Sequence, residues 1–384
     1  MKKENKSVII LGSTGSVGRQ AEDVALKENI KVEAVSACKN VGAIEAQVRL
    51  FGCRACAMSD EGAARELKTR LADTSSKVYS GADGIREMIL ETEADSAVNS
   101  IIGEAGLDAT LAVLKSGKRL ALANKESLVV AGEVVMNLAR EKGATVYPVD
   151  SEHCAIFQCL SAGRREDVKK LILTASGGPF YGKKRDELRS VRVLDALAHP
   201  TWSMGAKITV DSATLMNKGF EVIEAAHLFG VGADKIEVVV QRESIIHSMV
   251  EYIDNSIIAQ MSVPDMRLCV QYALGAPVRG EAVINELDFE KLGSITFGRP
   301  DTDTFVLLPL ALKALSLGGA VPAVLNAANE VAVSAFLDGK IGFTDIFDIV
   351  TETVESLRAK KDIHTLDGII ASDREAREAA GKLI

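Results

Sequence analysis

Aromatic residues and cysteines are scarce in this sequence. Aromatic side chains make up 4% of its 384 residues, and only six cysteines are present. So few cysteines in so long a chain exclude a disulfide framework like that of small secreted domains. Cys53 and Cys56 have Cys-x-x-Cys spacing, but no second pair follows at zinc-site spacing. We therefore interpret both as reduced thiols, rather than as a redox motif or half of a zinc site.

Clustered positive charge and long apolar runs are also lacking. The net charge of −8 argues against a nucleic-acid partner, because such binding depends on grouped Lys and Arg. No apolar run approaches the roughly 20 residues of a membrane span. The apolar run after the basic start MKKENK is too short for a signal peptide. We expect a cytoplasmic protein with neither a membrane nor a nucleic-acid partner.

In the first 150 residues, short β-branched runs alternate with amphipathic segments. Strand and helix repeated in this way predict a parallel, doubly wound α/β sheet of the Rossmann-like kind. Its ligand should lie beyond the carboxyl ends of the strands. We expect strands at 7–11, 31–36, 54–58, 95–100, 119–124 and 145–149.

The pattern changes after residue 150. Strand-like runs at 169–175, 235–241, 247–253 and 257–263 predict an antiparallel or mixed sheet. We therefore expect a central α+β domain at 151–275, a connector at 276–303 and a small helical domain at 304–384, after a nucleotide-binding domain at 1–150.

A glycine-rich turn follows the first expected strand, with Gly12, Gly15 and Gly18 three residues apart. Glycines let backbone N–H groups approach a pyrophosphate, and the helix expected from Ser16 adds its positive end. The spacing differs from the usual Gly-x-Gly-x-x-Gly, and a tight turn without ligand is the alternative. Its place on the first strand of an alternating α/β run favours dinucleotide binding.

The end of the second strand indicates which dinucleotide is bound. NAD enzymes usually place Asp or Glu there for the ribose hydroxyl. This chain has Lys39 and Asn40 instead. A lysine suits a 2′-phosphate, which favours NADPH, although an ordinary solvated lysine is the alternative.

Two clusters contain carboxylates suited to a divalent metal. Asp150 and Glu152 flank Ser151 at the end of the last strand of the first domain, and their oxygens suit Mg²⁺ or Mn²⁺. A helix N-cap is the alternative for this segment. Asn217, Lys218 and Glu221 fall at helical spacings on one edge, where they could grip a phosphate ester and a metal, or simply form an exposed ion pair.

A further loop and a histidine segment suggest substrate contacts. Ser176 precedes Gly177 and Gly178, whose backbone N–H groups could cradle a phosphate. His199, Trp202 and Gly205 lie in a segment that suggests a mobile lid. A structural histidine and a core tryptophan are the alternatives.

Six segments together closely resemble the 1-deoxy-D-xylulose 5-phosphate reductoisomerase family. They are LGSTGSVG, ANKES, VDSEH, TASGGPF, HPTWSMG and VDSATLMNKGFEVIEA, in the family's order and covering essentially the whole chain. The resemblance implies an NADP-dependent oxidoreductase of non-mevalonate isoprenoid biosynthesis. Its substrate, 1-deoxy-D-xylulose 5-phosphate, would rearrange by retro-aldol and aldol steps. NADPH would then reduce the branched aldehyde to 2-C-methyl-D-erythritol 4-phosphate.

The resemblance also implies roles for individual residues. The implied ligands of Mg²⁺ or Mn²⁺, with Co²⁺ as a further candidate, are Asp150, Glu152 and Glu221. The implied catalytic residues are these three together with Lys125 and Glu126. Two of the metal ligands, Glu152 and Glu221, also contact the substrate, and Lys125 lies on the substrate oxygens. The other substrate contacts implied are Ser151, Ser176, His199, Trp202, Ser212, Asn217 and Lys218. The cofactor contacts implied are Thr14, Gly15, Ser16, Val17, Cys38, Lys39, Asn40, Asn124, Glu126 and Gly205.

This chain departs from the family pattern at two of these positions. Cys38 stands where glycine is common, which puts a backbone contact to the cofactor in doubt, and Val17 replaces a common isoleucine. The family forms homodimers, and the central domain is the expected interface.

Two other classes of protein fit the sequence less well. A semialdehyde or homoserine dehydrogenase with a similar first domain would not need three metal-suited carboxylates beside a phosphate grip. A non-catalytic nucleotide-binding protein would be expected to have lost part of the carboxylate set, which is complete here.

Overall fold

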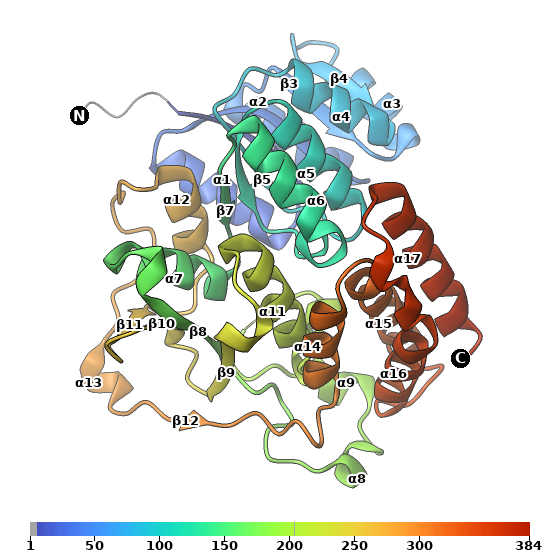
Figure 1. Cartoon of the computed structure of the whole chain (residues 1–384). Helices are drawn as coiled ribbons and strands as arrows, with labels where there is room; N and C mark the ends of the chain where they lie inside the picture. The colour runs from blue at the N-terminus through green and yellow to red at the C-terminus, as the bar shows by residue number, and fades with distance from the viewer. Residues whose placement is uncertain (1–5, 203) are drawn as a thin grey trace. The chain divides into compact units, whose positions relative to one another are not determined.

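The computed structural model describes residues 6–202 and 204–384, so most of the basic start lies outside the described residues. The chain forms two compact units, and Figure 1 labels their helices and strands where there is room. The first unit combines the chain up to Ser127 with Val135–Cys154 and Asp265–Asn285, and the second contains Leu128–Val134, Ala155–Pro264 and Glu286–Ile384. In the described part of the chain, no helix is both long and apolar enough to cross a membrane.

The first unit is built on a parallel sheet. Within the described residues it has seven strands in the order β4-β3-β2-β1-β5-β6-β7. Val8 to Leu11 of β1 are completely buried, as the apolar run predicted for a central parallel strand. The expected doubly wound α/β architecture is confirmed. The strands are β1 Ser7–Leu11, β2 Lys31–Ala37, β3 Ala55–Met58, β4 Lys77–Ser80, β5 Ser96–Asn99, β6 Arg119–Leu122 and β7 Val146–Pro148.

Helices connect these strands, and side-chain caps fix where two of them begin. Asn40 accepts a hydrogen bond from the backbone N–H of Ala43, and Asp60 accepts one from Ala63. The helices are α1 Ser16–Lys27, α2 Val41–Phe51, α3 Glu61–Arg70, α4 Gly81–Glu91 and α5 Ala105–Lys115.

A late segment of the chain returns to this unit. Helix α12 (Arg267–Gly275) packs against α1. Arg119 donates to the carbonyl oxygens of Leu274 and Ala276, at 3.2 and 3.1 Å, and its guanidinium lies 4.5 Å from the ring centre of Tyr147. The sequence patterns did not indicate this return, and the division into three sequential domains stays a prediction.

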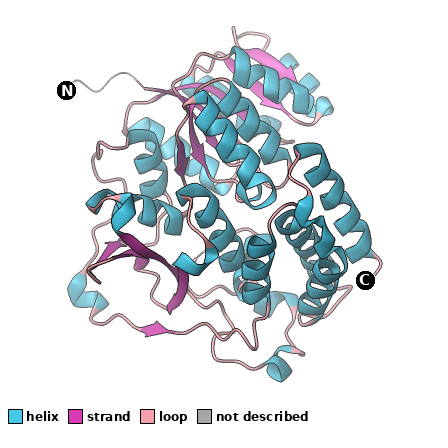
Figure 2. Ribbon diagram, in the orientation of Figure 1, coloured by secondary structure: helices cyan, strands magenta, loops and turns pink. Residues whose placement is uncertain are grey.

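The second unit contains the other sheet, in the order β11-β10-β8-β9-β12 among the described residues. Strand β8 runs parallel to β9 and antiparallel to β10, so the sheet is mixed, as expected. Figure 2 shows its strands in magenta. The strands are β8 Val168–Ala175, β9 Ile236–Gln241, β10 Ile246–Tyr252, β11 Ile257–Met261 and the short β12 Phe297–Gly298.

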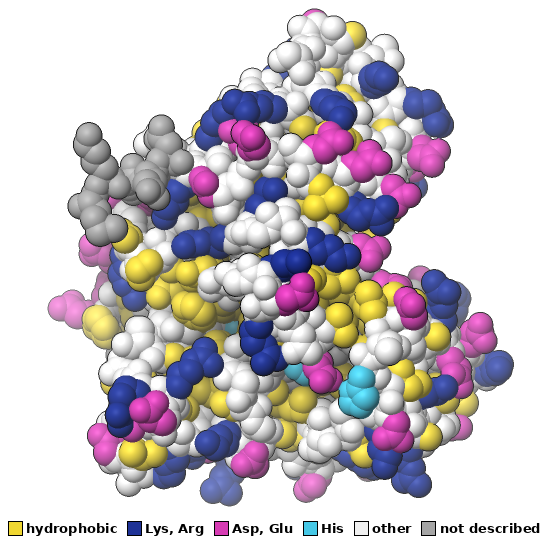
Figure 3. Space-filling model, turned by 45° about the horizontal axis from the view of Figure 1, so that its top comes forward, with side chains coloured by type: hydrophobic (Ala, Val, Ile, Leu, Met, Phe, Trp, Pro, Cys, Tyr) yellow, Lys and Arg dark blue, Asp and Glu magenta, His cyan; other side chains and the backbone are white. Residues whose placement is uncertain are grey.

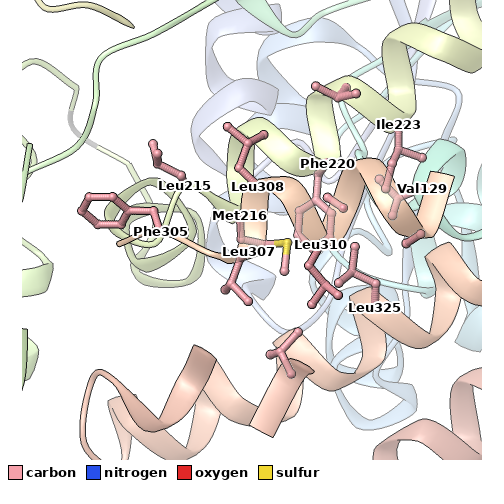
Figure 4. Close-up of a cluster of buried hydrophobic side chains, with 14 of the residues drawn as sticks. Val129, Leu215, Met216, Phe220, Ile223, Phe305, Leu307, Leu308, Leu310 and Leu325 are labelled. Carbon is pink, nitrogen blue, oxygen red and sulfur yellow. The ribbon is translucent and has the colours of Figure 1, made fainter. Parts of the chain in front are cut away.

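Helices form the rest of the second unit and its core. Met216 and Phe220 of α11 meet Leu307 and Leu310 of α14 and Leu325 of α15, all of them buried (Figure 4). The helical segment expected from residue 304 is confirmed. The helices are α8 Arg185–Leu188, α9 Val193–Ala196, α10 Ala206–Ala213, α11 Met216–Phe229, α13 Phe289–Leu292, α14 Leu307–Leu317, α15 Val321–Leu337, α16 Asp345–Leu357 and α17 Leu366–Gly381.

Two helices contribute residues to both units. Helix α6 (Glu126–Lys142) is interrupted at Ala131, whose φ of −136° and ψ of 33° are not helical. Helix α7 spans Ser151–Cys159. On the face drawn in Figure 3, basic and acidic side chains are interspersed, as expected for a surface without a broad field of one sign.

Candidate active site

The glycine turn after β1 has the backbone that its sequence predicts. Gly12 has a φ of +75°, which glycine adopts without strain, and a methyl group on Gly18 would lie 2.4 Å from the carbonyl oxygen of Gly12. Both glycines are therefore required by the geometry of the turn. Gly15 is the N-cap residue of α1, and both it and Ser16 are exposed. The turn thus presents the N-terminus of α1 to solvent, a suitable site for an anion.

This turn lies at the point where the strand order reverses. Strand β1 pairs with β2 on one side and β5 on the other, and the chain leaves it in the Gly12 turn. Ser100, just after β5, donates to the carbonyl oxygen of Leu11 at 2.7 Å. Crevices at such switch points bind ligands in open α/β sheets. Thr14 and Val17, both partly buried, flank Gly15 and Ser16 in the same turn.

The residues expected near a 2′-phosphate follow β2. Cys38 is an exposed thiol, and Lys39 has 77% of its side chain exposed, with its ammonium 3.9 Å from Asp60. Asn40 is committed to capping α2. Lys39 is thus weakly paired and available to a ligand.

Cys53 and Cys56 differ from the exposed Cys38. Burial raises the pKa of both thiols to about 12, as expected for inert thiols.

Asn124 and Glu126 form a buried network where β6 leads into α6. The amide of Asn124 donates to Glu126 at 2.7 Å and to the carbonyl oxygen of Ile101 at 2.8 Å. Its oxygen accepts from the backbone N–H of Ser127 at 2.8 Å. The side chain of Asn124 therefore holds the turn together, so a contact to a nicotinamide would have to come from its backbone.

Asp150 and its neighbours occupy the end of β7 and the start of α7. Asp150 accepts from the backbone N–H groups of Glu152 and His153, at 3.2 and 3.4 Å. Its other carboxylate oxygen binds the ammonium of Lys125. Ser151 donates to the carboxylate of Glu152. Two carboxylates, a lysine and a hydroxyl thus lie together in the first unit.

The second cluster lies on the first two turns of α11. Glu221 is 1% exposed and accepts from the amide of Asn217, at 2.5 Å, and from the ammonium of Lys218. The helical grouping that the spacing predicted is confirmed. The alternative of an exposed ion pair is wrong, because Lys218 and Glu221 are both buried. Burying a charged pair costs free energy, so it is typical of a functional site.

Ser176 and its two glycines form a tight loop after β8. Gly177 and Gly178 have φ values of +79° and +65°, and the hydroxyl of Ser176 accepts from the N–H of Gly178 at 3.2 Å. A methyl group on Gly178 would lie 2.7 Å from the carbonyl oxygen of Ser212. The loop therefore packs directly against α10, which carries Ser212.

His199 is held as a neutral imidazole beside this loop. Its Nδ1 accepts from the backbone N–H groups of Thr201 and Trp202, at 3.3 and 3.0 Å. The proton therefore belongs on Nε2, which donates to the hydroxyl of Ser176 at 3.1 Å. Burial, and then the positive charge of Arg242, lowers the pKa of His199. The hydroxyl of Ser176 is left with its own hydrogen to donate.

The lid segment is partly described. The indole of Trp202 has its ring centre 6.3 Å from that of His247, and Gly205 is the N-cap residue of α10. The lid itself stays a prediction.

Sequence reasoning missed two residues that support this loop and helix. The guanidinium of Arg242 donates to the carbonyl oxygens of Ser176 and Gly178, both at 2.9 Å. Asp211, 1% exposed, binds Lys207 at 3.0 Å and accepts from Asn329 at 2.7 Å. The position of Arg242 just after a strand was a signal, because side chains at strand ends often build sites.

Family models account for most of the chain. A model described as 1-deoxy-D-xylulose 5-phosphate reductoisomerase matches residues 8–132. Two further models match residues 146–229 and 261–379, described as the C-terminal domain of 1-deoxy-D-xylulose 5-phosphate reductoisomerase and as the DXP reductoisomerase C-terminal domain.

Curated proteins and solved structures agree with these models. A 1-deoxy-D-xylulose 5-phosphate reductoisomerase of Caldanaerobacter subterraneus subsp. tengcongensis is 52% identical over 97% of this chain and 98% of its own length. One of Ruminiclostridium cellulolyticum is 47% identical over 99% of both chains. The reductoisomerase of Zymomonas mobilis in complex with NADPH superimposes with a TM-score of 0.92, at 43% identity over 99% of both chains. A DOX-P reductoisomerase structure with NADPH, fosmidomycin and magnesium gives a TM-score of 0.92, at 38% identity over 98% of both chains.

Proposed function

Because the chain belongs to the 1-deoxy-D-xylulose 5-phosphate reductoisomerase family, we propose that it converts 1-deoxy-D-xylulose 5-phosphate into 2-C-methyl-D-erythritol 4-phosphate. The reaction is NADPH-dependent and requires a divalent metal ion. The observation that carries this assignment is the 52% identity to a named reductoisomerase over 97% of this chain. The enzyme is accordingly an oxidoreductase of isoprenoid biosynthesis.

Asp150 and Glu152 of the first unit, with Glu221 of the second, are our proposed ligands for Mg²⁺ or Mn²⁺, with Co²⁺ as a substitute. Their oxygen donors fit such ions. In the structure the ammonium group of Lys125 binds Asp150, and the ammonium group of Lys218 binds Glu221. Each of these two carboxylates thus contacts a cationic side chain. When bound, the metal supplies Lewis-acid polarisation of the substrate's carbonyl and hydroxyl oxygens.

The substrate's phosphate is proposed to bind in the second unit. The hydrogen on Ser176, the ammonium of Lys218 and the amide of Asn217 are donors on the neighbouring loop and helix, and His199 and Ser212 complete the set. Trp202 covers the substrate. This grip lies away from the reacting carbons, so its binding energy serves to position them. Lys125 and Ser151 orient the reacting oxygens.

NADPH is proposed to bind across the switch point of the first sheet. Thr14, Gly15, Ser16 and Val17 offer the pyrophosphate the exposed N-terminus of α1, and Lys39, with Cys38 and Asn40, faces the 2′-phosphate. Asn124 and Glu126 hold the nicotinamide half, and Gly205 contributes from the lid segment. The cofactor supplies the hydride that reduces the aldehyde.

A homodimer and a cytoplasmic location complete the proposal. The outer edge of β11 has no strand partner among the described residues, and it carries the half-exposed Ile257. The six free cysteines suit a reducing compartment.

The decisive assay follows NADPH absorbance with 1-deoxy-D-xylulose 5-phosphate and Mg²⁺, with and without EDTA. We expect oxidation that stops on chelation and resumes with Mn²⁺. Metal-independent oxidation would instead favour a simple dehydrogenase.

Glu221→Gln removes one negative charge from the proposed metal site. Since the amide cannot supply the negative charge, we expect turnover to fall at least 10³-fold, about 4 kcal/mol of barrier, while NADPH binding, measured by fluorescence, is unchanged. Glu290→Gln, an exposed carboxylate of the same unit, is the matched control. Near-normal turnover of Glu221→Gln would disprove its metal role.

A further inference from the structure

A pocket in the second unit lies outside the site described above. Its walls come from the interrupted part of α6, the end of α11, the turn before α15 and the segment leading into α17. The residues that define it, here called the His227 pocket, include Gly132, Glu133, His227, Gly319, Pro322 and His364. Three of them carry groups that commonly bind metals, each from a different segment of the chain.

His227 sits against the backbone of α6 next to its interruption at Ala131. A methyl group on Gly132 would lie 2.3 Å from Cδ2 of His227, so only glycine allows this approach. Among the described residues, neither ring nitrogen of His227 has a hydrogen-bond partner, although the ring lines the pocket. Burial lowers the pKa of His227, which keeps the imidazole neutral, the form that binds metals.

Glu133 and His364 lie at the same pocket and already contact each other. Nδ1 of His364 is 3.2 Å from a carboxylate oxygen of Glu133. Their side chains are 60% and 56% exposed, so both can change rotamer at little cost. The negative charge of Glu133 also acts on His227, whose pKa it raises against the larger effect of burial.

We propose that the His227 pocket binds a transition-metal dication of the Zn²⁺ class through the imidazoles of His227 and His364 and the carboxylate of Glu133. Two nitrogens and one oxygen, with water completing the shell, form a donor set that Zn²⁺ and Co²⁺ accept and Mg²⁺ disfavours. The donor atoms do not all lie within 4.8 Å of one another in the structure. Binding therefore requires Glu133 and His364 to turn toward the partly buried His227.

A metal here would connect three segments that are distant in sequence. It would fix α6 at its interruption, α11 at its last turn, and the chain just before α17. Helix α11 also carries Asn217, Lys218 and Glu221, so occupancy should change stability and substrate binding without touching the reacting atoms. This pocket is independent of the proposed function, because none of its ligands belongs to the carboxylate set.

Cobalt separates this pocket from the proposed catalytic metal site. We would titrate metal-free protein with Co²⁺ in excess Mg²⁺ and measure bound cobalt by equilibrium dialysis together with the visible spectrum. An imidazole-containing site of low coordination number gives much stronger visible bands than an all-oxygen octahedral site. We expect a strong band that saturates at one Co²⁺ per chain, and Zn²⁺ should abolish it by competition. Zn²⁺ should also raise the unfolding temperature.

Variants assign the band to the pocket. His364→Gln and Glu133→Gln are exposed changes with little risk to folding, and each should weaken the band-forming Co²⁺ at least tenfold. Glu141→Gln, an exposed residue further along α6, is the control and should bind as the unaltered chain does. The inference is overturned if no strong band forms, or if His364→Gln keeps the same band and affinity.

Discussion

Asp150 shows how a single residue can serve two functions that the sequence left as alternatives. One carboxylate oxygen caps the first turn of α7 through the N–H groups of Glu152 and His153. The same carboxylate binds the ammonium of Lys125. Capping fixes the direction of the side chain, and a fixed carboxylate loses less entropy when it binds a metal. The cap and the proposed ligand are therefore compatible.

Lys39 offers a test of cofactor choice at the residue scale. Its ammonium is exposed and has a single acidic neighbour, Asp60, at the long distance of 3.9 Å. The charge of Lys39 is therefore available to a 2′-phosphate. We expect Lys39→Ala to weaken NADPH binding about tenfold, or ~1.4 kcal/mol, and to leave NADH binding unchanged. Fluorescence titration with both cofactors measures this, with the exposed Lys68→Ala as control. Equal losses for the two cofactors would show that Lys39 does not read the phosphate.

Glu22 on α1 should make stability depend on pH. Burial, and then the charge of Asp23, raises the pKa of Glu22 from 4.5 to about 7, and one of its oxygens is buried without a hydrogen-bond partner. Between pH 4.5 and 7, the unfolded chain releases this proton while the folded chain retains it. This group therefore lowers stability as pH rises through that window, and its cost is complete above pH 7.

Replacing Glu22 with Gln removes this ionisation. Because the side chain is only half-buried, we expect a gain of about 1 kcal/mol at pH 8 and almost none at pH 5, well below the full value of the shift. Urea unfolding at both pH values measures the difference. Glu87→Gln on α4, an exposed carboxylate that is not among the groups acting on Glu22, is the control. A gain at pH 5 as large as that at pH 8 would contradict the assignment.

At the scale of elements, hydrophobic periodicity predicted the buried strands but neither a short, exposed strand nor a break within a helix. The run that became β1 is continuously apolar, and it was placed at its observed limits. Strand β4 was missed, because this strand is only four residues long, KVYS, and most of them are not buried. The interruption of α6 at Ala131 had no signal of its own in the sequence, and neither had the close packing of His227 against the neighbouring Gly132.

Some site residues could likewise be predicted from the sequence, and others could not. Asn217, Lys218 and Glu221 share one helix, so their spacing was enough to group them. Arg242 was missed, because in QRESII it looks like a solvated turn residue. Its role depends on carbonyl groups that lie more than sixty residues earlier in the chain.

Arg242 should position the Ser176 loop rather than act in the reaction. It holds two carbonyl oxygens of the loop at 2.9 Å and stacks 5.0 Å from the ring centre of Tyr181. A lysine has a shorter reach and a single ammonium. We expect Arg242→Lys to raise KM for the sugar phosphate about tenfold, or ~1.4 kcal/mol, with kcat within about threefold and the NADPH Kd unchanged.

Steady-state kinetics and NADPH titration separate this role from its alternatives. Arg189→Lys, which changes an exposed guanidinium of the same unit, should leave KM unaltered. A large loss of kcat with normal KM would mean that Arg242 acts on the reacting atoms. A loss of NADPH binding would indicate general misfolding.

At the scale of the whole molecule, the sequence indicates which elements form and gives little about which segments join. Residues 265–285 return to the first unit because Arg119 and α1 pack against α12. No periodicity encodes a contact between segments 155 residues apart. The same holds for the His227 pocket, whose three proposed ligands belong to segments that seemed unrelated in the sequence.

The dimer proposal can be tested at the free edge of β11. This strand pairs only with β10 among the described residues, and Ile257 and Ile258 are 50% and 38% exposed. An exposed apolar edge strand is a template for pairing with another chain, and a lysine there is the usual protection against it. If β11 forms the interface, Ile257→Lys places a charge where two copies meet.

We expect light scattering to give the unaltered protein twice the 40.9 kDa mass of one chain, and Ile257→Lys the mass of a monomer at micromolar concentration. Circular dichroism should be unchanged, because Ile257 is half-exposed and adds little to the fold. Leu50→Lys on α2, where the leucine is 65% exposed, is the matched control and should stay dimeric. If Ile257→Lys remains a dimer, the interface lies elsewhere. If the unaltered chain is a monomer, an exposed β11 edge is simply tolerated by this fold.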